Sequence, residues 1–220
     1  MLRLVIFDMD GVIIDSEPIH QRIEDEMFRE LGLMITDEEH QSFVGTTTSF
    51  MWEMLIEKYR LPYTPLELVE EGHRRFFNKL STLGEVQPMP GLMPFLKRLK
   101  DKGIRTAVAS SSSRKLVEPV LMLLGVRDYF ELLVCGDDVE RGKPEPDIFL
   151  RAAAIMDVLP EECIVIEDSE NGVKAAKAAG MRCIGFKNPN SGKQDLSRSD
   201  VVIEGFFDLT DEMLQSLFKG

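Results

Sequence analysis

The residues best suited to chemistry are two aspartates near the start of the chain. Asp8 and Asp10 follow an apolar run at residues 4–7, and Gly11 comes directly after them. Alternate residues of a strand point to opposite faces, so the chain must leave the strand between the aspartates if both serve one site. Gly11 permits the tight turn that this requires. Neighbouring buried carboxylates repel each other and lose hydration, and a divalent cation such as Mg²⁺ would offset both costs.

Polar residues also end or follow the later strand-like segments. Ser110 ends the second segment, Lys143 follows the third, and Glu167 with Asp168 ends the fourth. In an open parallel sheet the carboxyl ends of the strands share one edge, where ligands bind. Carboxylates can hold Mg²⁺, while a hydroxyl, an ammonium and backbone N–H groups can bind phosphate oxygens. The set predicts phosphoryl transfer with a carboxylate nucleophile, since no Walker loop is present and Cys and His are poorly placed.

Simpler interpretations exist for each of these groups. The paired aspartates could cap a helix, Ser110 could belong to a polar helix start, and Lys143 could be a solvated loop residue. Ser112 and Arg114 either line the site or belong to an exposed helix start. The convergence of all the groups on one sheet edge favours a functional role for the set.

Apolar runs predict the strands that position these residues, with the last run the weakest. The runs are residues 2–7, 105–109, 131–135, 163–166, 182–186 and 201–203. Apolar residues at helical spacing predict helices between them, at residues 92–102, 147–156 and 172–179. Alternating strands and helices predict an α/β fold with a doubly wound parallel sheet.

One part of the chain breaks this alternation. Residues 17–86 show helical periodicity and no convincing strand, which predicts an all-helical insert. The remaining core would consist of residues 1–16 and 87–220. Because the two linkers at residues 15–18 and 87–91 lie at the same point of the core, they form a natural hinge for a lid.

Composition limits the partners of the protein. The formal net charge of −12 over 220 residues argues against nucleic acid, although local positive charge could still bind an anionic substrate. The three cysteines lack metal-ligand spacing, and Cys163 and Cys183 lie in apolar runs, so we expect buried free thiols. No secretion signal or membrane-length apolar stretch is evident. We expect a cytoplasmic protein without a membrane partner, as a monomer or weak homo-oligomer.

Four motifs in this order resemble those of the haloacid dehalogenase-like hydrolase superfamily. They are residues 8–12, Ser110, residues 142–144 and residues 167–169. The resemblance extends over nearly the whole chain, and the most similar subgroup is the β-phosphoglucomutase-like phosphatases. It implies a Rossmann-like catalytic core with a helical cap, Mg²⁺ as cofactor and an aspartyl-phosphate intermediate.

The resemblance also implies a role for each catalytic residue. Asp8 would attack phosphorus as the nucleophile. Asp10 would be the general acid/base that protonates the leaving alcohol and then activates the hydrolytic water. Ser110 and Lys143 would hold phosphoryl oxygens.

The same resemblance implies a metal site and substrate contacts. Mg²⁺ would be bound by Asp8, the backbone carbonyl of Asp10 and Asp168, with Glu167 as a further ligand or as a hydrogen-bond acceptor outside the ligand set. Residues beside the motifs and in the cap would contact the substrate. These are Gly11, Val12, Thr46, Thr47, Thr48, Ser111, Ser112 and Arg114.

The expected function is a Mg²⁺-dependent phosphatase that hydrolyses a small phosphorylated metabolite, with a sugar phosphate as one candidate. A β-phosphoglucomutase-type isomerase is the first alternative, but those mutases carry an arginine where this chain has Thr48, and their cap lysine has no clear counterpart. A phosphoacceptor signalling module is the second, and the helical insert and the spacing of Asp8 and Asp10 argue against it. Dehalogenation is disfavoured by Asp10, which that branch lacks.

Basic residues of the predicted cap leave two interpretations open. His20 follows the first linker, where β-phosphoglucomutases carry a histidine, but it could equally be a packing residue. The basic run of His73, Arg74 and Arg75 could meet an anionic substrate or form a solvated helix face.

Overall fold

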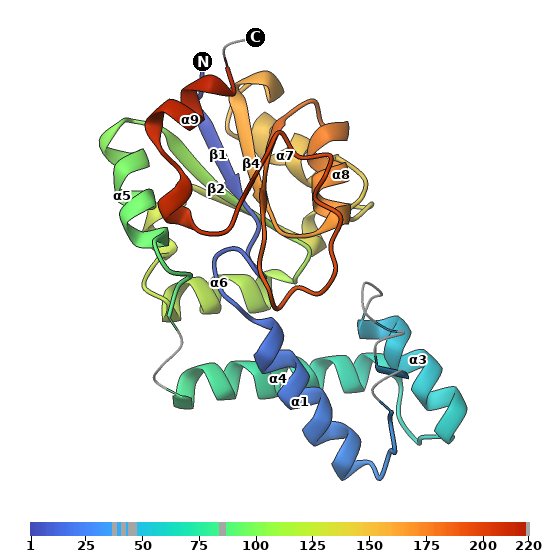
Figure 1. The fold of residues 1–220 in the computed structure, drawn as a ribbon. Helices are drawn as coiled ribbons and strands as arrows, with labels where there is room; N and C mark the ends of the chain where they lie inside the picture. The colour runs from blue at the N-terminus through green and yellow to red at the C-terminus, as the bar shows by residue number, and fades with distance from the viewer. Residues whose placement is uncertain (37–38, 41–42, 44–47, 84–86, 219–220) are drawn as a thin grey trace. The chain divides into compact units, whose positions relative to one another are not determined.

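The computed structural model describes residues 1–36, 39–40, 43, 48–83 and 87–218 (Figure 1). The chain divides into two compact units. The core unit comprises Met1–Ser16 and Glu85–Gly220, and the helical unit comprises Glu17–Gly84. The first division coincides with the predicted boundary after residue 16, and the second lies two residues before the predicted boundary after residue 86. That the helical unit acts as a cap stays a prediction.

The core unit is built on a six-stranded sheet in which every pairing is parallel. Its strands are β1 (Leu4–Phe7), β2 (Arg105–Ser110), β3 (Leu132–Cys135), β4 (Cys163–Glu167), β5 (Arg182–Phe186) and β6 (Val201–Ile203). The strand order is β3-β2-β1-β4-β5-β6, so β1 lies between β2 and β4. This confirms the predicted doubly wound α/β fold.

Helices cover both faces of the sheet, which explains why the strands are apolar along their whole length. On one face, α7 (Asp147–Ile155) and α8 (Glu170–Ala178) pack in a core cluster with Leu4 and Ile6 of β1. On the other face lies α5 (Leu92–Asp101), opposite α8 in Figure 1. There the ring of Phe7 lies 6.0 Å from that of Phe95 and 6.3 Å from that of Phe206, between ring centroids.

Further helices and 3-10 turns complete the core unit. They are α6 (Arg114–Leu123), α9 (Asp211–Ser216) and the 3-10 turns Arg127–Tyr129, Gly136–Asp138, Pro160–Glu162 and Phe206–Asp208. One helix start differs from the sequence expectation, because α8 begins at Glu170 rather than at residue 172. The hydroxyl of Ser169 accepts a hydrogen bond from the backbone N–H of Gly172 at 3.0 Å, so Ser169 is the N-cap.

The described residues of the helical unit form helices and no strand, as the periodicity predicts. The helices are α1 (Glu17–Glu30), α3 (Thr48–Tyr59) and α4 (Pro65–Leu83). Their apolar faces meet in a small core in which the rings of Phe28 and Trp52 lie 5.6 Å apart. None of the helices that the structure describes is long and apolar enough to span a bilayer.

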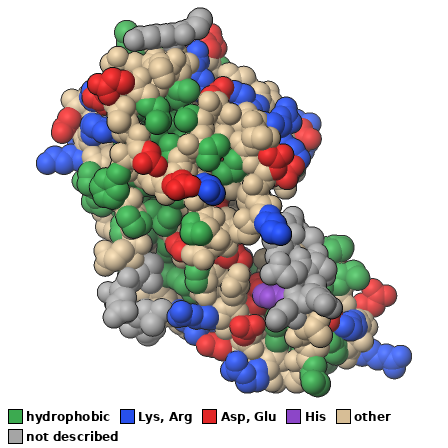
Figure 2. All heavy atoms as spheres, viewed as in Figure 1, with side chains coloured by type: hydrophobic (Ala, Val, Ile, Leu, Met, Phe, Trp, Pro, Cys, Tyr) green, Lys and Arg blue, Asp and Glu red, His purple; other side chains and the backbone are tan. Residues whose placement is uncertain are grey.

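Charged side chains are interspersed on the molecular surface. On the face drawn in Figure 2, Lys and Arg lie among Asp and Glu, and the described residues there form no continuous basic stripe. The mixture of both charges on this face agrees with the acidic composition.

Candidate active site

The predicted catalytic residues lie at the carboxyl edge of the sheet. Asp8 directly follows β1, and its backbone N–H donates to the carbonyl of Ile166 in β4 at 3.0 Å. Ser110 ends β2, Glu167 ends β4, and Asp168 follows it. All four of these polar side chains belong to buried residues. The sheet therefore brings residues that are far apart in the sequence to one edge.

Lys143 lies at the centre of this group. Its Nζ is 2.5 Å from Oδ1 of Asp8 and 2.6 Å from Oε1 of Glu167, and it donates to the carbonyl of Ala109 at 3.1 Å. Only 6% of the lysine side chain is exposed. A buried ammonium between two buried carboxylates is not the solvated loop lysine of the simpler interpretation.

Glu167 is held by protein groups at both of its carboxylate oxygens. Oε1 contacts Lys143, while Oε2 accepts hydrogen bonds from the backbone N–H and the hydroxyl of Ser169, both at 2.9 Å. A Cβ at position 172 would lie 1.8 Å from Oε1, so the glycine there leaves room for the carboxylate. These contacts favour the second alternative for Glu167, an acceptor outside the metal ligand set that orients Lys143.

Asp10 has different partners from Asp8. Its Oδ1 accepts from the hydroxyl of Ser16 at 2.8 Å, and its Oδ2 accepts from the hydroxyl of Ser112 at 2.9 Å. The turn between the aspartates is tight: Gly11 has a φ of 78°, and its N–H donates to the carbonyl of Ile14 at 2.7 Å. A glycine is needed for this conformation. The carboxylate of Asp10 thus lies in a hydroxyl environment, without a lysine.

Asp168 packs against the Gly11 turn. A Cβ at Gly11 would lie 1.9 Å from Oδ2 of Asp168, so a side chain at position 11 would collide with this carboxylate. The hydroxyl of Ser191 donates to the same oxygen. The turn that carries Asp8 and Asp10 is therefore in direct contact with the aspartate of the fourth motif.

Carboxylates outnumber cations in this site, and their pKa values reflect it. Burial raises the pKa of Asp8 well above its usual range; Lys143 opposes this, and the neighbouring carboxylates of Glu167, Asp168 and Asp10 add to it. Burial, together with the charge of Glu167, raises the pKa of Asp168 to about 7. Burial lowers the pKa of Lys143, but Asp8 and Glu167 outweigh it and raise that pKa above its ordinary value. The excess negative charge is what a divalent cation would neutralise.

Few oxygen atoms at this edge of the sheet are available to bind such a cation. Among the described residues, no three His, Cys, Asp or Glu side chains are arranged to hold a metal ion. Both side-chain oxygens of Glu167 and both of Asp10 contact Lys143 or serines, whereas Asp8 contacts Lys143 through one oxygen and Asp168 contacts Ser191 through one oxygen. The donors left at this edge are the side chains of Asp8 and Asp168 and the backbone carbonyl of Asp10. These hard oxygen donors fit Mg²⁺, with water and phosphate completing its coordination.

The predicted substrate-binding residues of the core unit differ in whether they reach the site. Ser112 reaches the site through Asp10, and Ser111 is exposed beside it. Val12 is fully buried, and its N–H donates to the carbonyl of Met9 at 3.3 Å, so the structure exposes no part of it to a ligand. Arg114 lies at the start of α6 and binds Oδ2 of Asp138 at 2.7 Å and the carbonyl of Leu133, so its guanidinium is engaged by the β3 segment.

The predicted cap residues are described only in part. Thr46 and Thr47 lie outside the described residues, and Thr48 is the exposed first residue of α3. The ring of His20 stacks on that of Phe76 at 4.3 Å, which favours the packing interpretation. Arg74 pairs with Glu71 at 2.6 Å, and Arg75 pairs with both Glu71 and Glu30 at 2.6 Å. These ion pairs favour a solvated helix face over an anion site.

Residues of the loop after β5 join the site without having been predicted. Asn188 donates to the backbone carbonyl of Gly11 and to Asp15, and Ser191 contacts Asp168. No motif or local spacing in the sequence distinguishes these residues from other loop positions. Only the adjacency of β4 and β5 in the sheet brings them to this edge.

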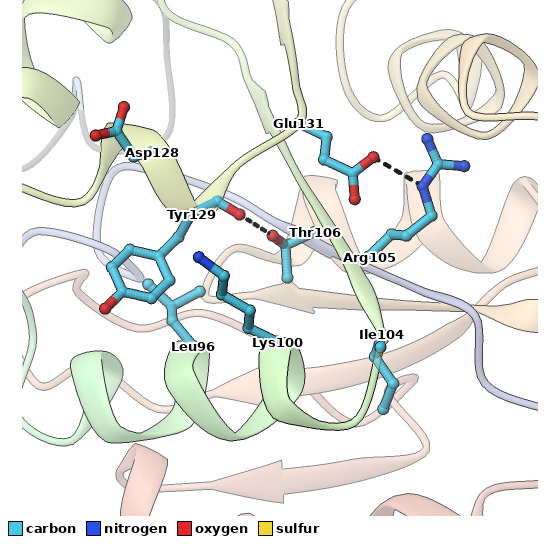
Figure 3. Close-up of a pocket in the computed structure, with 9 residues that line it drawn as sticks. Leu96, Lys100, Ile104, Arg105, Thr106, Asp128, Tyr129 and Glu131 are labelled. Atoms are coloured by element: carbon cyan, nitrogen blue, oxygen red, sulfur yellow. Dashed lines mark hydrogen bonds and ion pairs between the residues drawn. The ribbon is translucent and has the colours of Figure 1, made fainter.

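A cavity of about 210 Å³ lies elsewhere in the core unit (Figure 3). It is found at the amino ends of β2 and β3, where Arg105 binds Glu131 at 2.9 Å and the Thr106 hydroxyl donates to the carbonyl of Tyr129. This is the sheet edge opposite Asp8 and Ser110. The cavity is therefore separate from the candidate active site.

Taken together, the fold and the site define a doubly wound α/β protein with a lysine-bridged acidic cluster at the carboxyl edge of its sheet. Such a cluster suits phosphoryl transfer, which depends mainly on positioning and charge neutralisation.

The comparisons agree with one another. A family model described as haloacid dehalogenase-like hydrolase matches residues 2–180. The phosphorylated carbohydrates phosphatase of Thermotoga maritima is 32% identical and aligns over 92% of this chain and 94% of that protein. The β-phosphoglucomutase of Bacillus subtilis is 31% identical over 97% of this chain and 94% of that protein. The crystal structure of CbbY from Rhodobacter sphaeroides with phosphate has 30% identity and a TM-score of 0.82, covering 94% of this chain and 95% of that one.

The chain belongs to the haloacid dehalogenase-like hydrolase family. This confirms the resemblance drawn from the four motifs and the expectation of an enzyme. Its relatives include a protein named as a phosphatase and one named as a mutase, as the resemblance to the β-phosphoglucomutase-like subgroup implies.

Proposed function

We propose that the protein is a Mg²⁺-dependent phosphatase that hydrolyses a small phosphorylated metabolite through a phosphoaspartate on Asp8. The observation that carries the proposal is the contact of Lys143 with Asp8 at the edge where Asp10, Ser110 and Asp168 also lie. The name of the Thermotoga maritima relative supports a sugar phosphate as the substrate class.

In the first half of the reaction, a carboxylate oxygen of Asp8 attacks the phosphorus atom. A bond forms between this oxygen and phosphorus, and the bond between phosphorus and the substrate oxygen breaks. Asp10 donates its proton to the leaving oxygen, so that a neutral alcohol departs. The described hydrogen-bond partners of the Asp10 carboxyl group are the hydroxyls of Ser16 and Ser112.

In the second half, Asp10 accepts a proton from a water molecule that attacks the phosphoaspartate. The bond between phosphorus and Asp8 breaks, inorganic phosphate leaves, and both aspartates return to their starting forms. One group thus serves as acid and then as base, which requires a carboxyl group that is free of metal and of lysine.

Lys143 and Ser110 bind the transferring group. The three N–H donors of Lys143 bind Asp8, Glu167 and the carbonyl of Ala109, so a phosphoryl oxygen would replace one of these partners, and the ammonium charge would offset the charge that develops on the phosphoryl group. The hydroxyl oxygen of Ser110 accepts from the backbone N–H of Ser112 at 3.1 Å, which leaves its own proton for a phosphoryl oxygen. Asp8, Asp168 and the Asp10 carbonyl would hold Mg²⁺. When bound, the ion neutralises phosphoryl charge and orients the substrate.

A panel of phosphorylated sugars and other metabolites, assayed for phosphate release, tests this proposal. We expect release with Mg²⁺, loss of release with EDTA, and at least a roughly thousand-fold lower rate for Asp8→Asn, because the amide is not a nucleophile. Asp101→Asn, at the end of α5, is the matched control. Normal release by Asp8→Asn would contradict the mechanism, and no release from any substrate with Mg²⁺ present would contradict the function.

A β-phosphoglucomutase activity is the second candidate, favoured by the relative of that name in Bacillus subtilis. The threonine at position 48 argues against it, since a bisphosphate intermediate requires a cation at its second phosphate. Incubation with β-glucose 1-phosphate and a bisphosphate activator separates the two functions. The phosphatase releases inorganic phosphate, whereas the mutase accumulates glucose 6-phosphate.

A further inference from the structure

The loop after β5 contacts two parts of the candidate site, the Gly11 turn and Asp168. This β5 loop comprises residues 187–194 and begins beside β4, because β4 and β5 are neighbours in the sheet. Its Asn188 is a buried residue, 5% exposed. The amide of Asn188 donates to the carbonyl of Gly11 at 3.2 Å and to Oδ1 of Asp15 at 3.1 Å. The loop thereby holds the backbone of the turn that follows Asp8 and Asp10.

The same loop also holds Asp168. The hydroxyl of Ser191 donates to Oδ2 of Asp168, and the backbone N–H of Ser191 donates to the carbonyl of Asn188 at 3.2 Å. The side-chain oxygen of Asn188 accepts from the N–H of Asn190 at 2.9 Å. Asn188 therefore fixes the conformation of the loop and, through it, the position of Ser191.

Asp168 depends on this contact more than the other acids do. Lys143 binds Asp8 and Glu167, and Asp10 has two serines, whereas the hydrogen bond that the structure gives Asp168 comes from Ser191. The carboxylates around Asp168 repel it. Without Ser191, the side chain of Asp168 would lose the group that fixes its rotamer against that repulsion.

We infer that Ser191 and Asn188 are positioning residues: they hold Asp168 and the Gly11 turn in the mutual geometry that Asp8 and Asp168 need to share a cation. The inference rests on the proposed function. Neither residue touches the reacting atoms, so both act through the groups they orient. Outer contacts of this kind affect metal affinity by 10- to 100-fold when they are removed.

The variant Ser191→Ala tests the inference, with Ser197→Ala as a matched control. Both changes remove one hydroxyl from the connection between β5 and β6, but Ser197 is exposed and its side chain makes no described contact with the site. Mg²⁺ alone is titrated into each substrate-free protein by calorimetry. The Mg²⁺ concentration for half-maximal hydrolysis of p-nitrophenyl phosphate and the thermal unfolding midpoint are measured in parallel.

We expect Ser191→Ala to bind Mg²⁺ about 10- to 100-fold more weakly at an unchanged unfolding midpoint. Ser197→Ala should match the wild type, and Ser191→Thr, which keeps a hydroxyl, should recover most of the affinity. Asn188→Ala should weaken Mg²⁺ binding in the same direction. Asn190→Ala, which removes an exposed partner of Asp15, should do so much less.

Two results would overturn the inference. One is Mg²⁺ affinity in Ser191→Ala equal to that of Ser197→Ala. The other is a lowered unfolding midpoint with unchanged Mg²⁺ affinity, which would show that the loop contact is only structural. A wild-type protein that neither binds Mg²⁺ nor releases phosphate would instead contradict the proposed function, so the two failures are distinguishable.

Discussion

Asp8 and Asp10 are separated by a single residue but have different surroundings. Asp8 is in contact with the ammonium of Lys143, whereas Asp10 accepts hydrogen bonds from the hydroxyls of Ser16 and Ser112. Burial and the neighbouring carboxylates raise the pKa of Asp8, and Lys143 opposes them, so this cation favours the ionised form that a nucleophile requires. A carboxyl group among hydroxyls can gain and lose a proton without breaking an ion pair. The division of work between nucleophile and general acid/base thus follows from the partners of each side chain.

Replacement of Lys143 by methionine tests the importance of the buried cation. Its loss leaves the carboxylates of Asp8 and Glu167 facing each other without a counter-charge, so we expect a destabilisation of about 3–5 kcal/mol and loss of phosphate release. Urea unfolding followed by circular dichroism measures the stability. Lys187→Met is the control, because Lys187 pairs with Glu204 on the surface and such pairs contribute about 0–1 kcal/mol. Equal stability of the two variants would show that the Lys143 contacts contribute little.

At this scale the sequence predicts residues that belong to motifs and names Ser112 as a candidate without its partner. It misses Asn188 and Ser191, which act through tertiary contact. Asp8, Lys143 and Asp168 end or follow apolar strands, and that position alone predicts that they converge. The link from Ser112 to Asp10 spans 102 residues and that from Asn188 to Gly11 spans 177. Loop serines and asparagines have no periodicity, so nothing local identifies their partners.

The elements that position the site are held by the aromatic face of the sheet. Phe206 lies in a 3-10 turn, and its ring centroid is 5.1 Å from that of Phe186, 5.6 Å from that of Phe95 and 6.3 Å from that of Phe7. Phe7 immediately precedes Asp8. Packing around Phe206 therefore supports the strand end from which the nucleophile emerges.

Neighbouring phenylalanines provide a matched test of this packing. Phe206 is 2% exposed and Phe207 is 74% exposed. We expect Phe206→Ala to lower the free energy of unfolding by about 3–5 kcal/mol, because it removes a buried ring and leaves a cavity. Phe207→Ala should change it by less than about 0.5 kcal/mol. Denaturant titration of both variants checks this, and similar losses in the two would contradict the assigned core.

Strands were easier to predict than the turns between them. The bounds of β5 and β6 agree with the apolar runs, and in β5 this follows because a buried parallel strand carries apolar residues on both faces. β1 begins at Leu4, two residues later than expected. The 3-10 turn of Phe206 was not predicted, because three residues are too few for a periodic pattern.

For the whole molecule, the sequence predicts which residues form each of the two units, but it does not predict how the units work together. The long gap between the first two strands, filled by helical periodicity, marks the insert, and the described residues of that unit form helices. The cap function and the substrate contacts of the insert remain predictions. A basic run in the sequence does not reveal whether its side chains already form ion pairs, as Arg75 does with Glu30.

The cysteines give a test of the whole fold. Cys135, Cys163 and Cys183 are free and buried. Burial raises the pKa of Cys135 to about 11, that of Cys163 to about 12, and that of Cys183 above its ordinary value. A raised pKa keeps the thiol protonated at pH 8, and the thiolate is the reactive form. We expect no reaction of the folded protein with Ellman's reagent and reaction of all 3 thiols after unfolding in guanidinium chloride. Rapid reaction of a thiol in the folded protein would contradict this burial.

The central claim is that Asp8 carries the phosphoryl group, and trapping that group tests it most directly. The enzyme is mixed with Mg²⁺ and p-nitrophenyl phosphate, quenched in acid and treated with borohydride, which reduces an aspartyl phosphate to homoserine. Tandem mass spectrometry then locates the modified residue. The account predicts homoserine at position 8 in the wild type, more of it in Asp10→Asn, and none in Asp8→Asn. Turnover without modification at position 8, or modification at another residue, would contradict it.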